Sequence, residues 1–264
     1  RGLVERLGEG TQRGFAALHR VIAFIGELVV ALVGVIWRPV TANWRSVVQL
    51  ATVAGADGVP VVVILNFLVG FVMGMQSARQ LELYGANVFV ADVVGISVTR
   101  ELGPLVTAIV MIGRSGAAYA AEIGTMRVSE ELDALRTMGV SPPRYLVLPR
   151  IAALILVAPL LTLLGDVVGV LGGIVVGATS LDVSPRAFLS ELESAVYVRD
   201  VVGGMVKSLF FGLAIGIIGC QQGLAATGGA TGVGRRTTAT VVISLIAVVI
   251  IDAIFAIILK AIRQ

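Results

Sequence analysis

Five long apolar stretches dominate this sequence and restrict what it can fold into. They run from Gly58 to Ala78, Asp92 to Glu122, Leu146 to Leu181, Val201 to Gly223 and Thr237 to Lys260. Each reaches the roughly 20 residues that an α-helix needs to cross about 30 Å of hydrocarbon. Because 57% of the 264 residues are apolar and only 14% are charged, the composition is not that of a soluble globular domain. The sequence therefore predicts an all-α integral membrane protein with five transmembrane helices.

Two segments leave alternatives open. The third stretch is longer than the hydrocarbon requires, so either it tilts and protrudes or Gly165 and Asp166 mark a break. The segment Phe15 to Trp37 is interrupted by charged residues, which favours an amphipathic interfacial helix over a sixth span. We therefore divide the chain into an N-terminal amphipathic, interfacial region, residues 1–57, and a five-span domain, residues 58–264.

The distribution of basic residues predicts the orientation. With a cytoplasmic N-terminus, the inner connections hold most of the loop arginines, as the positive-inside rule requires. The net charge of +3 is explained in this way, so we expect no nucleic acid partner. Because the only cysteine is Cys220 and the only histidine is His19, we expect neither a disulfide framework nor a metal site.

One dense polar segment, Glu122 to Arg150, separates the second and third stretches. Ser129 is positioned to cap a short helix, residues 128–140, and Gly139 to end it in a left-handed conformation. The first turn is acidic and the last is basic, which suits the helix dipole; these residues are Glu130, Glu131, Asp133 and Arg136. One side is apolar and consists of Val128, Leu132, Leu135 and Met138. This cytoplasmic helix is either a connector on the membrane surface or a docking element whose apolar ridge enters a groove on a partner.

No segment fits a nucleotide site. The nearest approach to a phosphate-binding loop, Val202 to Ser208, has Val206 where the pattern GxxxxGK[ST] needs glycine. The Gly-rich segment Gly228 to Thr238 is interpreted as a flexible cytoplasmic turn. No nucleophile, base and orienting group recur in a catalytic arrangement either. We therefore expect a non-enzymatic chain without a cofactor of its own.

Four of the charged residues within the apolar stretches are interpreted as intramembrane charges, where an unpaired charge costs at least ~2.5 kcal/mol. Arg114 and Asp166 lie at similar depth, which favours a structural ion pair at least as much as a contact with substrate, and Lys207 and Asp252 make a second candidate pair. Small residues also recur every four positions in the second stretch, which permits close approach of a neighbouring helix. Gly116, Ala120 and Gly124 form one row, and Gly113, Ala117 and Ala121 form the other. A neighbour from the same chain is favoured slightly over a second copy.

Several motifs resemble those of a known family. They are RELGP at 100–104, GRSG at 113–116, AEIGTMR at 121–127, EELDAL at 130–135, LPR at 148–150 and RRTTATVV at 235–242. Together they are similar to the MlaE permease family, the membrane subunits of bacterial lipid-transporting ABC systems. The likeness covers most of the chain beyond about residue 50.

The resemblance implies a homodimer in the bacterial inner membrane, each copy having five spans and an N-terminal membrane-embedded helix. It implies a cytoplasmic ABC ATPase that binds ATP and Mg²⁺, and a periplasmic MCE-domain protein. Phospholipid would pass between the inner and outer membranes through this assembly. The helix at 128–140 then corresponds to the coupling helix that seats in the ATPase.

The resemblance also implies a lipid cavity that opens toward the periplasm. Its residues would be Met73, Tyr84, Arg100, Glu101, Leu102 and Arg235. Two other functions fit the residues alone. An ion-gradient-driven secondary transporter or channel would use the four intramembrane charges, and a membrane anchor would only recruit partners without transporting anything.

Overall fold

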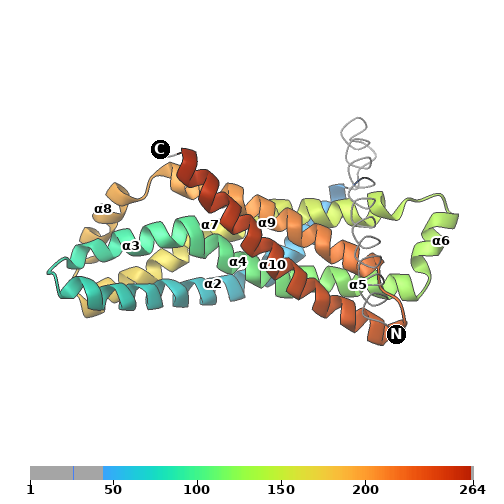
Figure 1. Cartoon of the computed structure of the whole chain (residues 1–264), viewed down its shortest axis with the longest axis horizontal. Helices are drawn as coiled ribbons and strands as arrows, with labels where there is room; N and C mark the ends of the chain where they lie inside the picture. Colours follow the sequence, from blue (N-terminus) through green and yellow to red (C-terminus); the bar gives the residue numbers. More distant parts are fainter. Residues whose placement is uncertain (1–25, 27–43, 263–264) are drawn as a thin grey trace, which may run out of the picture.

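A computed structural model describes residue 26 and residues 44–262, which form a bundle elongated along its helices (Figure 1). The predicted interfacial helix, Phe15 to Trp37, lies outside the described residues except for residue 26. In chain order the elements are α2 (Trp44–Glu82), η2 (Asn87–Phe89), α3 (Val90–Ser97), η3 (Val98–Leu102), α4 (Gly103–Met111), η4 (Ile112–Gly116), α5 (Ala117–Val128), α6 (Glu131–Thr137), η5 (Pro143–Val147), α7 (Leu148–Ser180), α8 (Pro185–Ala195), α9 (Val198–Leu224) and α10 (Gly229–Ile262). The all-helical prediction is confirmed, since no strand occurs among these residues.

The five predicted spans are present as five helical segments long and apolar enough to cross a membrane. The first begins earlier than expected, because α2 starts at Trp44 and continues through Pro60. The third is one unbroken helix through Gly165 and Asp166, so the alternative of a break there is wrong. The division of the chain at residues 57 and 58 stays a prediction, although α2 continues across it.

The second span is not a uniform α-helix. It is assembled from α3, α4 and α5, which are joined by the π-helical turns η3 and η4. A π turn inserts an extra residue into the helical repeat and rotates the side chains after it. These two turns contain Arg100 to Leu102 and Gly113 to Gly116, parts of the RELGP and GRSG motifs. The motif residues therefore occupy the irregular positions of the span.

Glycine permits the closest helix packing, which joins α2 to α7. A Cβ atom on Gly70 would lie 1.8 Å from the carbonyl oxygen of Gly169, and one on Gly172 would lie 2.3 Å from that of Phe67. Backbones in contact gain dispersion energy along their length, the usual source of helix association in a membrane. This contact fixes the first span against the third.

The row Gly116, Ala120 and Gly124 packs within the chain, as favoured from the sequence. Gly219 of α9 approaches the carbonyl oxygen of Gly116, and Gly223 approaches that of Ala120. The other row differs, because nothing lies within 4 Å of the position a Cβ atom would take on Gly113. The first row is therefore packed inside the chain, whereas Gly113, the first residue of the second row, is exposed at the surface.

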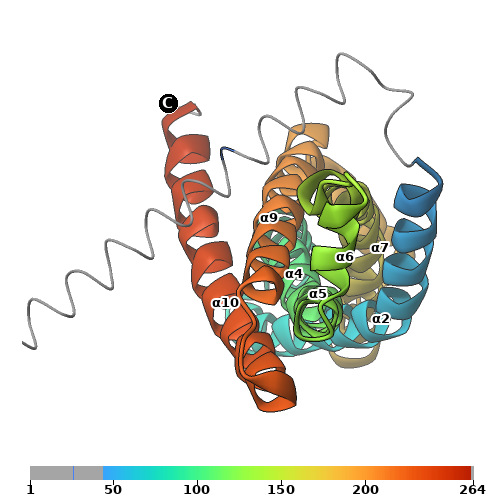
Figure 2. The same cartoon turned by 90° about the vertical axis from the view of Figure 1, so that its right-hand side faces the viewer.

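The two ends of the bundle carry different elements (Figure 1). The α6 end holds α6 and the turn between α9 and α10, and the α8 end holds α8 and the turn after α2. Seen from the α6 end, α10 and α2 lie on opposite flanks (Figure 2). The prediction of a flexible turn at Gly228 to Thr238 is wrong beyond its first residue, because α10 begins at Gly229. Only Gly228 and Gly229 need positive φ values, and the later residues of the segment suit a helix.

Candidate functional site

A network of ion pairs lies where the second, fourth and fifth spans meet, and the buried Lys207 is at its centre. The Lys207 side chain is fully buried, 0% exposed. Its Nζ lies 2.5 Å from Glu101 Oε2 of η3 and 2.9 Å from Asp252 Oδ1 of α10. The predicted pair of Lys207 and Asp252 is therefore confirmed, and Glu101 is a second partner that sequence reasoning missed.

Arg100 extends this network toward the α8 end. Its backbone carbonyl accepts a hydrogen bond from Lys207 Nζ at 2.9 Å. Its Nε lies 2.9 Å from Asp200 Oδ1 at the start of α9. Asp200 is buried and its Oδ2 also accepts from the backbone N–H of Tyr197. Asp200 was missed in the sequence, although an acid in the first turn of a helix is a signal that could have found it.

The π turn explains how Arg100 and Glu101 serve the same network from adjacent positions. Side chains of neighbouring residues normally diverge by about 100° around a helix. In η3, Glu101 and the carbonyl of Arg100 both reach Lys207, while the guanidinium of Arg100 reaches Asp200. The network holds two cations and three carboxylates, and Arg100 remains 27% exposed. It thus joins three helices, while Arg100 and Glu101, whose side chain is 41% exposed, keep access to the surface.

Of the other residues assigned to the lipid cavity, only Leu102 lies next to this network. Leu102 follows in η3 and is half-buried, and Met73 packs among apolar residues between α2 and α7. Tyr84 lies in the turn after α2 and is 82% exposed. Arg235 is exposed near the start of α10, at the α6 end, whereas Tyr84 lies at the α8 end (Figure 1). The structure brings together Arg100, Glu101 and Leu102 only.

The predicted pair of Arg114 and Asp166 is wrong. Arg114 Nη2 lies 3.0 Å from Asp57 Oδ2 of α2, and both side chains are about half exposed. Asp166 instead faces Gly103, where a Cβ atom would lie 1.8 Å from Asp166 Oδ1. The π turn η3 precedes Arg114 and η4 contains it. The extra residue in each turn rotates Arg114 away from α7. Asp166 is buried and makes no ion pair within the described part of the chain.

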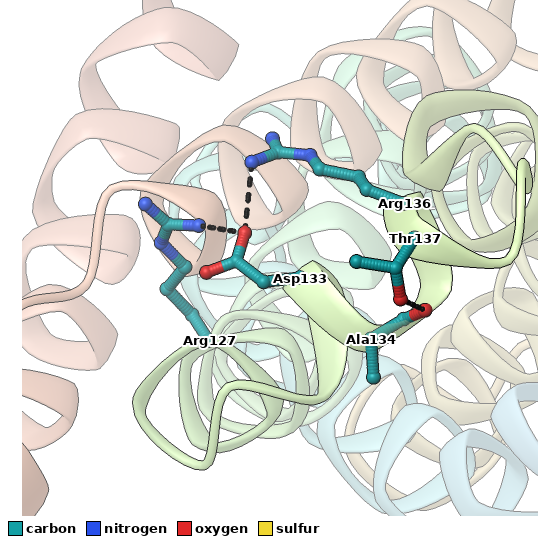
Figure 3. Close-up of polar contacts among 5 residues, drawn as sticks. All are labelled: Arg127, Asp133, Ala134, Arg136 and Thr137. Carbon is teal, nitrogen blue, oxygen red and sulfur yellow. Dashed lines mark hydrogen bonds and ion pairs between the residues drawn. The ribbon is translucent and has the colours of Figure 1, made fainter.

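The polar helix at the α6 end is shorter than predicted. Ser129 does not cap it, because Ser129 ends α5 and Glu130 turns the chain with a φ of 60°. The predicted stop at Gly139 is confirmed by its φ of 76°. Asp133 lies 3.2 Å from Arg127 Nη1 and 3.0 Å from Arg136 Nη1, so it bridges α5 and α6 (Figure 3). These exposed ion pairs link α6 to α5 at the surface of the bundle.

Some apolar residues of the α6 segment pack into the bundle, and others are exposed at the surface. Leu132 is fully buried against residues of α5, α7 and α9, and Leu135 packs partly on the same cluster. The expectation that Leu132 enters a groove on a partner is therefore wrong, since its side chain fills the core of its own chain. Met138 is 72% exposed, and Glu130, Glu131, Asp133 and Arg136 are exposed as well. A partner can reach these five residues.

Comparisons with known proteins agree with this architecture. The profile of the family described as Permease MlaE matches residues 47–258. A probable ABC transporter permease protein of Synechocystis is 43% identical over 79% of this chain and 79% of its own length. A second, from Rickettsia prowazekii, is 43% identical over 74% of this chain and 76% of its own length. The chloroplastic protein TRIGALACTOSYLDIACYLGLYCEROL 1 of Arabidopsis thaliana is 36% identical over 81% of this chain and 61% of its own length.

Proposed function

Because this chain belongs to the MlaE permease family, we propose that it is the subunit of an ABC transporter that moves phospholipid or a related lipid between the inner and outer membranes of a bacterium. Permease subunits of this class work with an ATPase on a separate chain, which supplies the ATP and Mg²⁺ chemistry. The segment that most resembled a phosphate-binding loop, Val202 to Ser208, lies inside α9. Its backbone N–H groups are within a helix and do not form an anion-binding loop.

The observation that carries the proposal is the way α6 is attached to the bundle. A coupling element must be exposed to the partner and also tied firmly to the spans that it moves. The exposed residues of α6 meet the first requirement and the burial of Leu132 meets the second. Force applied to α6 by the ATPase passes through the buried Leu132 to α5, α7 and α9.

Arg100 supports a lipid with an anionic head group. Its guanidinium lies at the α8 side of the buried network and keeps part of its surface exposed. A guanidinium binds phosphate oxygens in a forked geometry, and apolar helix faces beside it suit acyl chains. The name of the Arabidopsis relative refers to a diacylglycerol lipid. Phospholipid is therefore the substrate class that we propose.

A second copy of the chain is proposed from the exposed ion pair of Arg114 and Asp57. Both side chains are about half exposed in the isolated chain, although Arg114 lies within the second span. Charges do not face hydrocarbon without a large cost. Gly113 beside them offers open space for a close approach. A protein partner or a shared aqueous cavity on this face removes the conflict.

The residues at the two ends of the bundle support an orientation with the α6 end in the cytoplasm and the α8 end in the periplasm. The α6 end carries the arginines typical of a cytoplasmic face; they are Arg127, Arg136, Arg144, Arg235 and Arg236. The α8 end exposes large apolar side chains, which suit a periplasmic MCE-domain protein seated above the permease; they are Leu83, Tyr84, Leu189, Tyr197 and Val198. The N-terminus is cytoplasmic in this orientation, and the membrane is the bacterial inner membrane.

The test separates docking from folding. Met138→Asp places a charge on the exposed part of α6 without touching the core. We expect this variant to fold and to reach the membrane, but to lose the co-purifying ATPase and ATP-dependent lipid transfer between vesicles. Leu83→Asp, an equally exposed change at the α8 end, is the matched control and should retain the ATPase.

Two results would contradict the proposal. One is full ATPase binding and lipid transfer by the Met138→Asp variant. The other is lipid transfer, or ion flux, by the purified permease in vesicles that contain no ATPase, because this would favour a secondary transporter or channel. An anchor without transport function would keep its partners bound and move no lipid under any condition.

A further inference from the structure

A second buried polar cluster lies near the middle of the bundle, apart from the Lys207 network. It contains Asn66 of α2, Thr107 of α4, and Thr162 and Asp166 of α7, all of them buried to at least nine-tenths. Gly165 joins the three helices, since a Cβ atom there would lie 2.8 Å from Asn66 Nδ2 and 3.2 Å from Thr107 Oγ1. Thr162 and Asp166 are four residues apart on one face of α7. Three spans thus bring polar side chains to one place.

The oxygen atoms of this cluster have no hydrogen-bond partner among the residues that the structure describes. They are Asn66 Oδ1, Thr107 Oγ1, Thr162 Oγ1 and both carboxylate oxygens of Asp166. The amide nitrogen of Asn66 is already used, because it donates to the carbonyl oxygen of Val62 at 3.0 Å. Buried polar atoms in native proteins are nearly always satisfied. Five oxygens on four buried side chains of neighbouring helices therefore point to a ligand that is bound through oxygen.

The charge of the cluster defines the ligand. Asp166 is the one ionisable residue among the four, and it makes no ion pair with any described lysine or arginine. A single positive charge balances one carboxylate, whereas a divalent cation would leave an excess charge inside the membrane. Oxygen donors without sulfur or imidazole suit a hard cation. A proton on Asp166 is the competing occupant, and the experiment below distinguishes it from a metal cation.

We propose that Asn66, Thr107, Thr162 and Asp166 form a binding site for one Na⁺ ion in the middle of the membrane domain. The ion neutralises Asp166 and satisfies oxygens from α2, α4 and α7 together, so it locks the first three spans in one arrangement. Gly103 is part of the site, because any side chain there would collide with Asp166 Oδ1. This inference is independent of the lipid and of the ATPase.

The experiment measures binding of ²²Na⁺ to the full chain in lipid nanodiscs, without nucleotide or added lipid substrate. We expect saturable binding of one ion per chain, and a higher melting temperature in NaCl than in N-methylglucamine chloride, since a ligand of the folded state stabilises it. Asp166→Asn should abolish both effects. Thr107→Val and Thr162→Val should each weaken binding by about tenfold, the lower end of what the loss of a supporting partner costs a metal site.

Ser244→Ala is the control variant. Ser244 is equally buried and its hydroxyl also lacks a partner, but it belongs to α10 and not to this cluster. Its Na⁺ binding should equal that of the unchanged chain. If Asp166→Asn does not fold, the two valine variants still decide the question. The proposal is overturned if ²²Na⁺ binding is absent, if the valine variants bind as tightly as the unchanged chain, or if stability responds to pH but not to Na⁺.

Discussion

Two ion-pair clusters in this molecule share one arrangement, in which a central charged group lies between two groups of opposite charge. The sign of the central charge and its burial differ between them. In the membrane domain the fully buried Lys207 joins two carboxylates, Glu101 and Asp252. In α6 the exposed Asp133 joins two guanidinium groups, Arg127 and Arg136. Removing one partner of a buried pair strands a charge without water, whereas water and salt replace a lost partner at the surface. We infer that the first cluster fixes the bundle and the second leaves α6 adjustable.

The largest effect is expected at Lys207. Lys207→Met keeps most of the side-chain volume but leaves the largely buried Asp252 and the partly exposed Glu101 without their cation. The free energy of unfolding should fall by about 3 to 5 kcal/mol, the usual cost of breaking a buried ion pair. It is measured by reversible denaturation of the purified permease in mixed micelles. Arg186→Met, which removes an exposed cation from α8, should change it by less than about 0.5 kcal/mol.

A loss for Lys207→Met no larger than that for Arg186→Met would remove the distinction between the clusters. Such a result would mean that the buried network does not bear on stability, and that Lys207 serves transport alone. A sharper comparison comes from the double variant Lys207→Met, Asp252→Asn. If Asp252→Asn partly restores the stability that Lys207→Met removes, the loss is due to the unpaired carboxylates.

A much smaller effect is expected at Asp133. Asp133→Asn removes both exposed ion pairs of α6 while keeping the shape of the side chain. The free energy of unfolding should fall by at most about 1 kcal/mol, and the difference should shrink as salt is added. Denaturation of this variant at low and high NaCl checks both points. A loss as large as that at Lys207 would show that α6 is a structural element of the bundle and not an adjustable one.

The sequence predicted the parts of this fold that depend on hydrophobicity and local backbone chemistry. The five spans follow from apolar length, and the left-handed stop at Gly139 follows from the freedom of glycine. The pair of Lys207 and Asp252 was found because two opposite charges at similar depth need each other. Each of these inferences needed only a short stretch of sequence or one pair of opposite charges.

The missed features depend on tertiary geometry. The π turns η3 and η4 leave no mark in hydropathy, yet each rotates the side chains after it by an extra residue, about 100°. Counting depth along a uniform helix therefore assigned Arg114 to the wrong partner. At Leu132, helical spacing identified an apolar face correctly but could not distinguish a groove on a partner from the core of the same chain. Buried clusters such as that of Asp166 require residues from three helices to be placed together.

The most direct test of the coupling role of α6 is to find which protein it touches in the native assembly. A photo-crosslinking amino acid is placed at position 138 in living cells, with position 83 at the α8 end as the reference. We predict that position 138 yields a crosslink to the ABC ATPase and that position 83 does not. A crosslink from position 138 to a periplasmic protein, or ATPase adducts from position 83 instead, would contradict this role.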